Sequence, residues 1–215
     1  MAIQQKIEAR LAQAPVVPLI QADDPDVAVK TAEALKAGGL SVLECVLRTD
    51  SAVECMAQIV RSVDDVIVGA GTVLTVDQAS AVLGKGAQFI VSPGLVDDVA
   101  QLCIDRKVPF YGGTMTAGEV QRAHCLGLET VKFFPASLAG GTPMLKALGS
   151  VFRKMHFMPT GGISAANLSE YLALPQVIAC GGSWLTPADA IAAGDYSSIT
   201  RLAQEAVEIA TRSRK

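Results

Sequence analysis

Eight short apolar runs recur along the chain, and most are followed by a polar or Gly-rich turn and then a helical pattern. Strands that alternate with helices pair in parallel and are buried on both faces. Eight of them predict a closed (β/α)8 barrel, the TIM-barrel fold. The runs are Val16–Ile20, Val42–Leu47, Val66–Ala70, Phe89–Val91, Pro109–Tyr111, Thr130–Phe133, His156–Met158 and Val177–Cys180.

An open, doubly wound sheet is the alternative for the same alternating pattern. That fold carries a Gly-x-Gly-x-x-Gly turn after its first strand. Here the first run ends Ile20-Gln21-Ala22-Asp23, so the signature is missing. Half of the residues are apolar and only 5% are aromatic, which favours an aliphatic interior. Without a low-complexity segment or a long linker, residues 1–215 are predicted to form a single barrel domain.

Helical patterns lie between the runs. The clearest one has Asp24 as its N-cap, Pro25 at the first helical position, and Gly38-Gly39 after its last residue, Ala37. The stretch Met1–Gln13 reads as a short amphipathic helix and not as a signal peptide. Further helices are predicted at Asp97–Lys107, at Ala165–Leu172 with Ser164 as N-cap, and at Ile199–Arg212.

Charge and residue usage exclude several classes of function. The net charge of −3 and the scattered Lys and Arg residues argue against nucleic-acid binding. No run reaches the 18 or more apolar residues of a membrane span, so a cytoplasmic protein is expected. Five cysteines without Cys-x-x-Cys spacing argue against disulfides and zinc. With only two histidines, His124 and His156, we expect neither a metal site nor a Ser-His-Asp triad, and no cofactor.

Lys132 is the lysine that stands apart. Of the nine lysines it alone lies inside an apolar strand pattern, between Val131 and Phe133. An unpaired buried ammonium group is costly, and burial favours the neutral amine, which is the species that attacks a carbonyl carbon. We therefore predict that Lys132 is a Schiff-base nucleophile. The alternative is a lysine that reaches the barrel mouth or pairs with a carboxylate for stability alone.

Glu44 and Arg48 are the charged residues expected near Lys132. Strand alternation places Glu44, Val46 and Arg48 on one face of their strand, so a barrel that points Lys132 inward can point them inward too. Glu44 is predicted to move protons, the alternative being a simple ion pair. Arg48 would have to fold back over the mouth, where its guanidinium suits a substrate carboxylate. The alternative for Arg48 is an external salt bridge.

The last two strand ends each carry a Gly-Gly pair. Gly161-Gly162 and Gly181-Gly182 are followed by Ser164 and Ser183. Glycine lets backbone N–H groups converge on an anion, and in many barrels the loops after strands seven and eight bind phosphate. Gly161, Gly162, Gly182 and Ser183 are therefore candidate phosphate-binding residues.

Taken together, these segments resemble the family of 2-keto-3-deoxy-6-phosphogluconate (KDPG) aldolase and 4-hydroxy-2-oxoglutarate (KHG) aldolase. The resemblance extends over nearly the whole chain, which makes chance improbable. It rests on Val16-Val17-Pro18, Leu43-Glu44, Leu47-Arg48-Thr49, Gly69-Ala70-Gly71-Thr72-Val73-Leu74, Ser92-Pro93-Gly94, Lys132-Phe133-Phe134-Pro135-Ala136, Pro159-Thr160-Gly161-Gly162-Ile163 and Gly181-Gly182-Ser183-Trp184-Leu185.

The resemblance implies a role for each matching position. Lys132 would form the imine, Glu44 would move protons, and Arg48 and Thr72 would hold the carboxylate end of the keto acid. The remaining implied residues are Pro93, Phe134 and Thr160 in the pocket, and Gly161, Gly162 and Ser183 at the phosphate. It also implies a class I aldolase that cleaves KDPG to pyruvate and glyceraldehyde 3-phosphate, commonly as a homotrimer.

One segment departs from the family pattern. After the fifth run the chain reads Tyr111-Gly112-Gly113-Thr114-Met115-Thr116-Ala117-Gly118-Glu119, where the family usually has Pro-Gly and a Thr-Pro-Thr-Glu-like turn. Substrate fit near this loop is therefore an open question.

Four other functions are kept as alternatives. They are the related galactonate-type aldolase, a phosphate-binding isomerase that uses Glu44 with Lys132 acting only electrostatically, a divalent-metal aldolase, and a non-catalytic phosphosugar-binding protein. The galactonate type is disfavoured because it carries an Arg after strand one that this chain lacks, and lacks the Arg seen here as Arg48.

Overall fold

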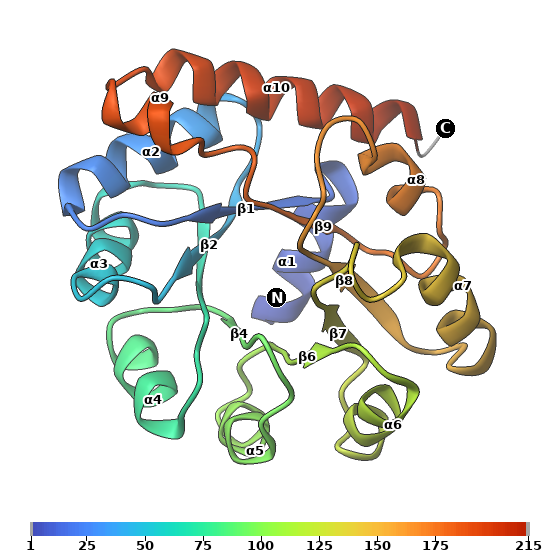
Figure 1. The fold of residues 1–215 in the computed structure, drawn as a ribbon. Coiled ribbons are helices and arrows are strands. Elements are labelled where there is room, and N and C mark those ends of the chain that lie inside the picture. Colours follow the sequence, from blue (N-terminus) through green and yellow to red (C-terminus); the bar gives the residue numbers. More distant parts are fainter. Residues whose placement is uncertain (1, 214–215) are drawn as a thin grey trace.

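The fold is a closed ring of parallel strands in a computed structural model that describes residues 2–213. Within these residues the strands are β1 (Val16–Ile20), β2 (Val42–Val46), β3 (Ile67–Gly71), β4 (Ile90–Val91), β5 (Phe110–Tyr111), β6 (Gly113–Thr114), β7 (Thr130–Phe133), β8 (His156–Pro159) and β9 (Cys180–Gly182). Figure 1 looks through the ring, with the helices around it.

Two hydrogen-bonded sheets make up this ring. One has the order β5-β4-β3-β2-β1-β9 and the other the order β6-β7-β8. Only Gly112 separates β5 from β6, so these two are one interrupted strand. Isolated parallel bridges, Phe157 to Val177 and Thr160 to Gly181, join β8 to the β9 segment and close the circle. The predicted (β/α)8 barrel is confirmed.

The helices surround the strands. They are α1 (Ile3–Gln13), α2 (Pro25–Ala37), α3 (Ala52–Ser62), α4 (Val76–Gly84), α5 (Asp97–Asp105), α6 (Ala117–Cys125), α7 (Gly141–Val151), α8 (Leu168–Leu172), α9 (Ala188–Ala192) and α10 (Tyr196–Ser213). As predicted, Asp24 caps α2 by accepting from the N–H groups of Asp26 and Val27. In residues 2–213, no helix combines the length and apolar character needed to cross a bilayer.

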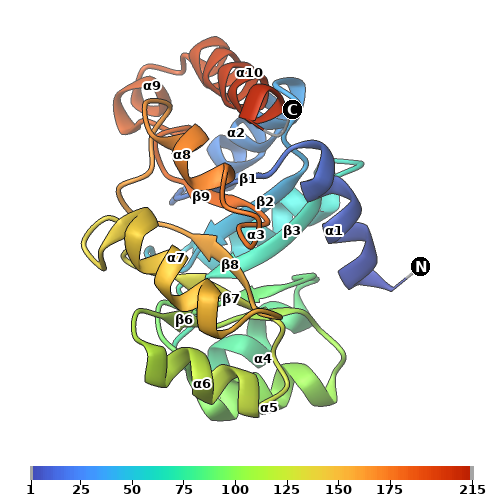
Figure 2. The same cartoon turned by 90° about the vertical axis from the view of Figure 1, so that its right-hand side faces the viewer.

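The N-terminal helix α1 lies apart from the surrounding helices. Figure 2 places it on the right of the barrel, with α9 on the left. Its Ile7 and Leu11 are buried and pack into the barrel interior. The predicted N-terminal helix is thus present, although Met1 lies outside the described residues. We call the apolar group that α1 joins the floor cluster: Ile7, Leu11, Val17, Val42, Ile67, Phe89, Val91, Tyr111, Met158 and Ala179.

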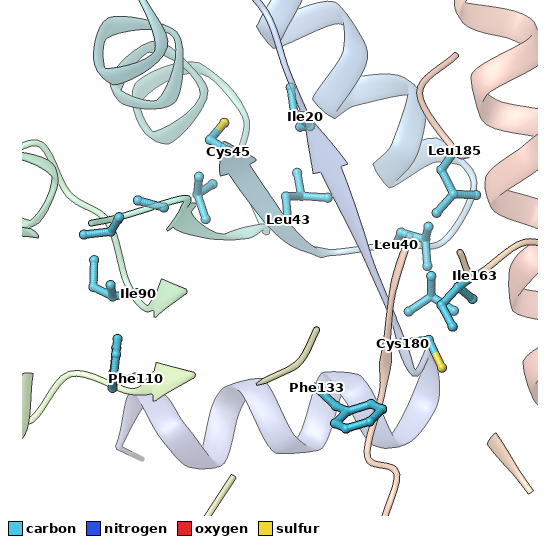
Figure 3. Packing of buried hydrophobic residues seen from close by; sticks show 14 of the residues in the cluster. Ile20, Leu40, Leu43, Cys45, Ile90, Phe110, Phe133, Ile163, Cys180 and Leu185 are labelled. Carbon is cyan, nitrogen blue, oxygen red and sulfur yellow. The ribbon is translucent and has the colours of Figure 1, made fainter. Parts of the chain in front are cut away.

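A larger apolar core lies between the strands and the helices. It contains the alternate residues of the same strands, for example Leu43 and Cys45 of β2 and Phe133 of β7 (Figure 3). Since successive side chains of a strand point to opposite faces, the residues between them must face the barrel interior. This alternation positions the side chains of the candidate site.

The last strand begins later than predicted. The sequence indicated Val177–Cys180, but pairing with β1 involves Cys180, Gly181 and Gly182. Val177 makes only a bridge to β8. Glycine is needed in this strand because a Cβ atom on Gly181 would meet the Thr160 hydroxyl oxygen at 2.2 Å. Apolarity therefore identified the strand but misplaced its paired residues.

Three helix limits also differ from the prediction. Ser164 does not cap a helix, because α8 starts at Leu168 with Asn167 as N-cap, and Asn167 Oδ1 accepts the Ser164 N–H at 2.9 Å. The helix α5 ends at Asp105, since Lys107 has a left-handed φ of 55°. The helix α10 begins at Tyr196, and Asp195 accepts the Ser198 N–H at 3.1 Å in its first turn.

Candidate functional site

Lys132 and Glu44 meet inside the barrel. The Lys132 Nζ atom lies 3.5 Å from Glu44 Oε1, and the two residues are only 4% and 1% exposed. Among the described residues they are the only buried Lys, Arg, Asp or Glu side chains. At this separation the pair attracts strongly in a medium of low dielectric constant, but each charge has lost its water. A buried ion pair of this kind is a costly arrangement for stability alone.

The strand pattern explains why these two side chains converge. Val131 and Phe133, on either side of Lys132, belong to the outer core, as do Leu43 and Cys45 on either side of Glu44. Lys132 and Glu44 are therefore left facing inward from β7 and β2. Gly71 on β3 leaves room for the carboxylate, because a Cβ atom there would lie 2.0 Å from Glu44 Oε1.

The Glu44 carboxylate has one oxygen with no hydrogen-bond donor. Oε1, the atom nearest Lys132, is buried and makes no hydrogen bond to a described residue. Such an atom is expensive to leave unsatisfied, and unsatisfied groups concentrate at functional sites. It is therefore free to accept a proton or a substrate hydrogen bond. Neighbouring Cys45 faces the outer core, where burial, Cys55 and Glu44 raise the pKa of its thiol far above the usual range.

Arg48 and Thr72 lie together at the mouth of the barrel. Arg48 Nε donates to Thr72 Oγ1 at 3.4 Å, and the Arg48 side chain is exposed. The guanidinium thus does reach the neighbouring strand end. Thr72 has a left-handed φ of 59°. For a β-branched residue this conformation is a true outlier, and such strain is typical of functional sites.

Phe134, Thr160 and Pro93 lie on three further strand ends. The Phe134 ring centroid is 5.3 Å from Lys132 Nζ, a cation–π distance. Thr160 is buried against Gly181. Pro93 is partly buried, and its carbonyl oxygen would lie 2.0 Å from a Cβ atom on Gly113, so Gly113 is needed for this close approach. The structure therefore places Phe134 beside Lys132 and Pro93 against Gly113.

The Gly161-Gly162 turn has the backbone that an anion site requires. Both residues have left-handed φ values, 94° and 75°. A Cβ atom on Gly162 would also meet the Ser137 hydroxyl oxygen at 2.1 Å. Both the left-handed backbone and the contact with Ser137 therefore exclude a larger residue at Gly162. Ser183 follows Gly182 at the end of β9 and is exposed.

The loop that departs from the family pattern supports the lysine strand. Thr114 is buried, and its hydroxyl group donates to the Lys132 carbonyl oxygen at 3.1 Å. The backbone N–H of Lys132 in turn donates to the Gly112 carbonyl oxygen at 3.0 Å. The departure therefore lies against the backbone of Lys132, where it fixes the strand.

A cavity of about 310 Å³ opens beside Arg48 and Ser183. Gln21 and residues of the helix α9 also line this cavity. The sequence patterns did not predict α9. Gln21 was missed because it lies one residue beyond its strand and carries no charge. A larger cavity of about 730 Å³, lined by Glu8, Glu129 and His156, lies beside α1 at the opposite end. Parallel barrels place their chemistry at the C-terminal strand ends, and of these two cavities the smaller one lies at that end, beside Arg48.

No metal cluster accompanies these residues in the part of the chain that the structure describes. There, no group of three or more His, Cys, Asp or Glu side chains could hold a metal ion. The chemistry available at the site is that of an amine, a carboxylate and a guanidinium. Together they can attack a carbonyl carbon, move a proton and hold an anion.

Comparison with known proteins gives one consistent result. The family model "KDPG and KHG aldolase" matches residues 7–202. The KHG/KDPG aldolase of Escherichia coli strain K12 is 47% identical over 201 residues, covering 94% of each chain.

Solved structures agree with this match. The KDPG aldolase of Zymomonas mobilis ZM4 with 3-phosphoglycerate has a TM-score of 0.87 and 41% identity, covering 94% of this chain and 95% of that one. The KDPG aldolase of Legionella pneumophila, with pyruvate captured at low pH as a covalent carbinolamine intermediate, has a TM-score of 0.88 and 40% identity. It covers 92% of this chain and 96% of that one. The protein therefore belongs to the KDPG and KHG aldolase family.

Proposed function

We propose that this protein is a class I aldolase that reversibly cleaves KDPG to pyruvate and glyceraldehyde 3-phosphate. The observation that carries the proposal is the buried Lys132 amine, 3.5 Å from the Glu44 carboxylate inside a barrel of this family. A lysine amine in its neutral form is a nucleophile towards a carbonyl carbon, and a carboxylate beside it is placed to accept and return protons. Covalent capture of pyruvate in the Legionella relative supports the same chemistry.

The first half of the reaction builds an electron sink. The neutral Lys132 amine adds to the C2 carbonyl carbon of the keto acid and forms a carbinolamine, which loses water to give a protonated imine. Arg48 and Thr72 hold the C1 carboxylate during this step. Their position at the ends of β2 and β3, where Arg48 Nε contacts Thr72 Oγ1, supports this assignment.

The second half breaks the carbon–carbon bond. A base removes the C4 hydroxyl proton, the C3–C4 bond breaks, and its electron pair moves into the imine to give an enamine. Glyceraldehyde 3-phosphate leaves. Glu44, or a water molecule that it orients, then delivers a proton to C3, and hydrolysis of the imine releases pyruvate and the free amine. The unsatisfied Glu44 Oε1 atom supports its use as the proton carrier.

The phosphate group of KDPG would bind at the ends of β8 and β9. We assign it to the backbone of Gly161, Gly162 and Gly182 and to the Ser183 hydroxyl group. The left-handed φ values of Gly161 and Gly162 support convergent N–H groups there. Pro93, Phe134 and Thr160 are assigned to the pocket wall.

Two substrate alternatives remain, and one of them has specific support. Cleavage of KHG to pyruvate and glyoxylate uses the same imine, and the E. coli relative carries both activities in its name. The galactonate-type substrate is the runner-up, but the presence of Arg48 favours the gluconate type. A coupled assay that compares gluconate- and galactonate-derived substrates, with and without phosphate, ranks them.

Borohydride trapping tests the proposal. Pyruvate and sodium borohydride should leave a carboxyethyl group on Lys132, found by peptide mass spectrometry, and should inactivate the enzyme. Lys154→Ala, a surface substitution, should behave like the wild type, whereas Lys132→Ala should take up no label. Cleavage without any trapped adduct would favour an isomerase-like or metal-dependent barrel, which the response to a chelator would separate. Phosphate-ester binding without pyruvate release would indicate a binding protein.

We further propose a cytoplasmic homotrimer. The family resemblance supports the oligomer, and the five free cysteines support a reducing compartment. Sedimentation measurements at micromolar concentration test the first point, and localisation of the tagged protein tests the second.

A further inference from the structure

The cavity beside Arg48 contains one polar side chain to which the mechanism gives no task. Apolar walls come from Leu19, Val46 and α9. The Thr186 hydroxyl group is already used, because it donates to the Leu19 carbonyl oxygen at 2.7 Å. Gln21 is exposed, lines the same cavity, and makes no side-chain hydrogen bond to any described residue. Its amide is therefore free to bind a ligand.

The strand order places Gln21 between the two proposed ends of the substrate. The sequence β2-β1-β9 around the ring puts the end of β1 between those of β2 and β9. Arg48 follows β2 and Ser183 follows β9, and both line the cavity with Gln21. A substrate held by its carboxylate near Arg48 and by its phosphate near Ser183 must pass the end of β1.

Strand alternation also directs Gln21 inward. Val16 and Ile20 of β1 belong to the outer core, whereas Val17 belongs to the floor cluster. Leu19 and Gln21 continue the inward series, and both line the cavity. Neither Lys132 nor Glu44 lines this cavity, so Gln21 is set apart from the amine and the carboxylate of the proposed chemistry.

We propose that Gln21 is a specificity residue that hydrogen-bonds the C5 hydroxyl group of the substrate. This inference rests on the proposed function. Of the two hydroxyl groups in KDPG, the one at C4 loses its proton in the reaction and must lie near Lys132. The one at C5 is next to the phosphate-bearing carbon. A primary amide can both donate to and accept from a secondary hydroxyl group, which suits it to read the configuration there.

The test uses the synthetic direction, in which pyruvate adds to an aldehyde. Glyceraldehyde 3-phosphate supplies the C5 hydroxyl group, and 3-oxopropyl phosphate lacks it. The variant Gln21→Met keeps the length of the side chain and removes the amide. We expect it to lower the preference for glyceraldehyde 3-phosphate over 3-oxopropyl phosphate, as a ratio of kcat/KM, by about threefold to tenfold, the range for one neutral hydrogen bond. Gln101→Met, on the exposed face of α5, is the matched control and should leave the ratio unchanged.

The outcomes separate this inference from the proposed function. Borohydride trapping of pyruvate on Lys132 should be equal in the wild type and in Gln21→Met, since Gln21 does not touch the amine. An unchanged aldehyde ratio with normal trapping would overturn the role of Gln21 alone. An equal loss of rate with both aldehydes would also overturn it, because it would indicate a role in shape. Absence of trapping in the wild type would remove both proposals.

Discussion

The two ends of the barrel differ in the side chains that the same strands direct inward. At the end closed by α1, inward positions carry the aliphatic and aromatic side chains of the floor cluster. At the other end, inward positions of β2 and β7 carry Glu44 and Lys132. On β2 the change from Val42 to Glu44 takes two residues, one step of strand alternation. A single strand thus contributes to the floor cluster at its start and to the proposed site at its end.

The two ends also differ in their expected contributions to the free energy of folding. Burial of the floor cluster is favourable at about 25 cal/mol per Å² of apolar surface. Desolvation of the Lys132–Glu44 pair is unfavourable, and the strained Thr72 backbone adds of order 1–3 kcal/mol. The end that carries the proposed site is therefore expected to lower the stability that the floor cluster provides. Substitutions at the two ends should separate activity from stability in opposite ways.

Among substitutions that keep the Lys132 amine, Glu44→Gln should give the largest effect on activity. The amide keeps the shape of the carboxylate but cannot carry the proton, so we expect kcat for KDPG cleavage to fall about 10²- to 10⁴-fold. Glu33→Gln, on the exposed face of α2, is the control. Steady-state assays coupled to pyruvate reduction measure the change. Turnover within tenfold of the wild type would remove Glu44 from the mechanism.

Lys132→Met tests the energetic half of the comparison. It leaves Glu44 buried without its cation and should lower the free energy of unfolding by about 3–5 kcal/mol. The double variant Lys132→Met with Glu44→Leu replaces the pair by apolar side chains and should restore or exceed wild-type stability. Urea denaturation measures both. A double variant as unstable as the single one would show that the pair stabilises the barrel.

How far the sequence predicted this molecule depends on the kind of signal. The run around Lys132 predicted both the strand and the inward lysine, because period-two alternation is local. The residues at Gly181 and Gly182 were assigned to a turn, since their pairing with β1 depends on a partner far away in the chain. The prediction placed the strand at Val177–Cys180 because Val177, Ile178 and Ala179 are apolar.

The candidate site shows the same limit. Lys132, Glu44 and Arg48 were named as candidates because a charge inside an apolar pattern stands out. Gln21 carries no charge and lies beyond its strand, so only the strand order and the cavity reveal its position between Arg48 and Ser183. The helix α9 was missed because five residues are too few to establish a helical period.

Leu11→Ala tests the floor. Leu11 is 2% exposed and packs into the barrel interior from α1. Its truncation should lower the free energy of unfolding by about 2–5 kcal/mol, while kcat at a temperature where the variant stays folded remains close to that of the wild type. Thermal unfolding and a parallel activity assay check the two halves. A loss of kcat in fully folded enzyme would mean that the two ends are coupled.

Tyr111→Phe should give the smallest effect and concerns the one polar group in the floor cluster. The Tyr111 hydroxyl is buried without a hydrogen bond of normal geometry, and its ring packs edge-on against Phe89 with centroids 5.9 Å apart. Removal of the hydroxyl should change the free energy of unfolding at pH 7 by no more than about 1 kcal/mol, in the stabilising direction, because an unsatisfied buried group is lost.

The pH dependence of this variant gives the sharper measurement. Burial raises the pKa of Tyr111 above its ordinary value of 10.0, with a further rise from Glu8 and a small opposing effect from Gln4. The folded protein therefore keeps this proton at a pH where the unfolded chain has lost it. This contribution to stability is complete below pH 10 and declines as the pH rises further. Urea denaturation between pH 8 and about 11 should show the wild type losing stability relative to Tyr111→Phe. If the two proteins show the same change in the free energy of unfolding with pH, water reaches the Tyr111 hydroxyl group. The floor cluster would then be more hydrated than the packing around α1 implies.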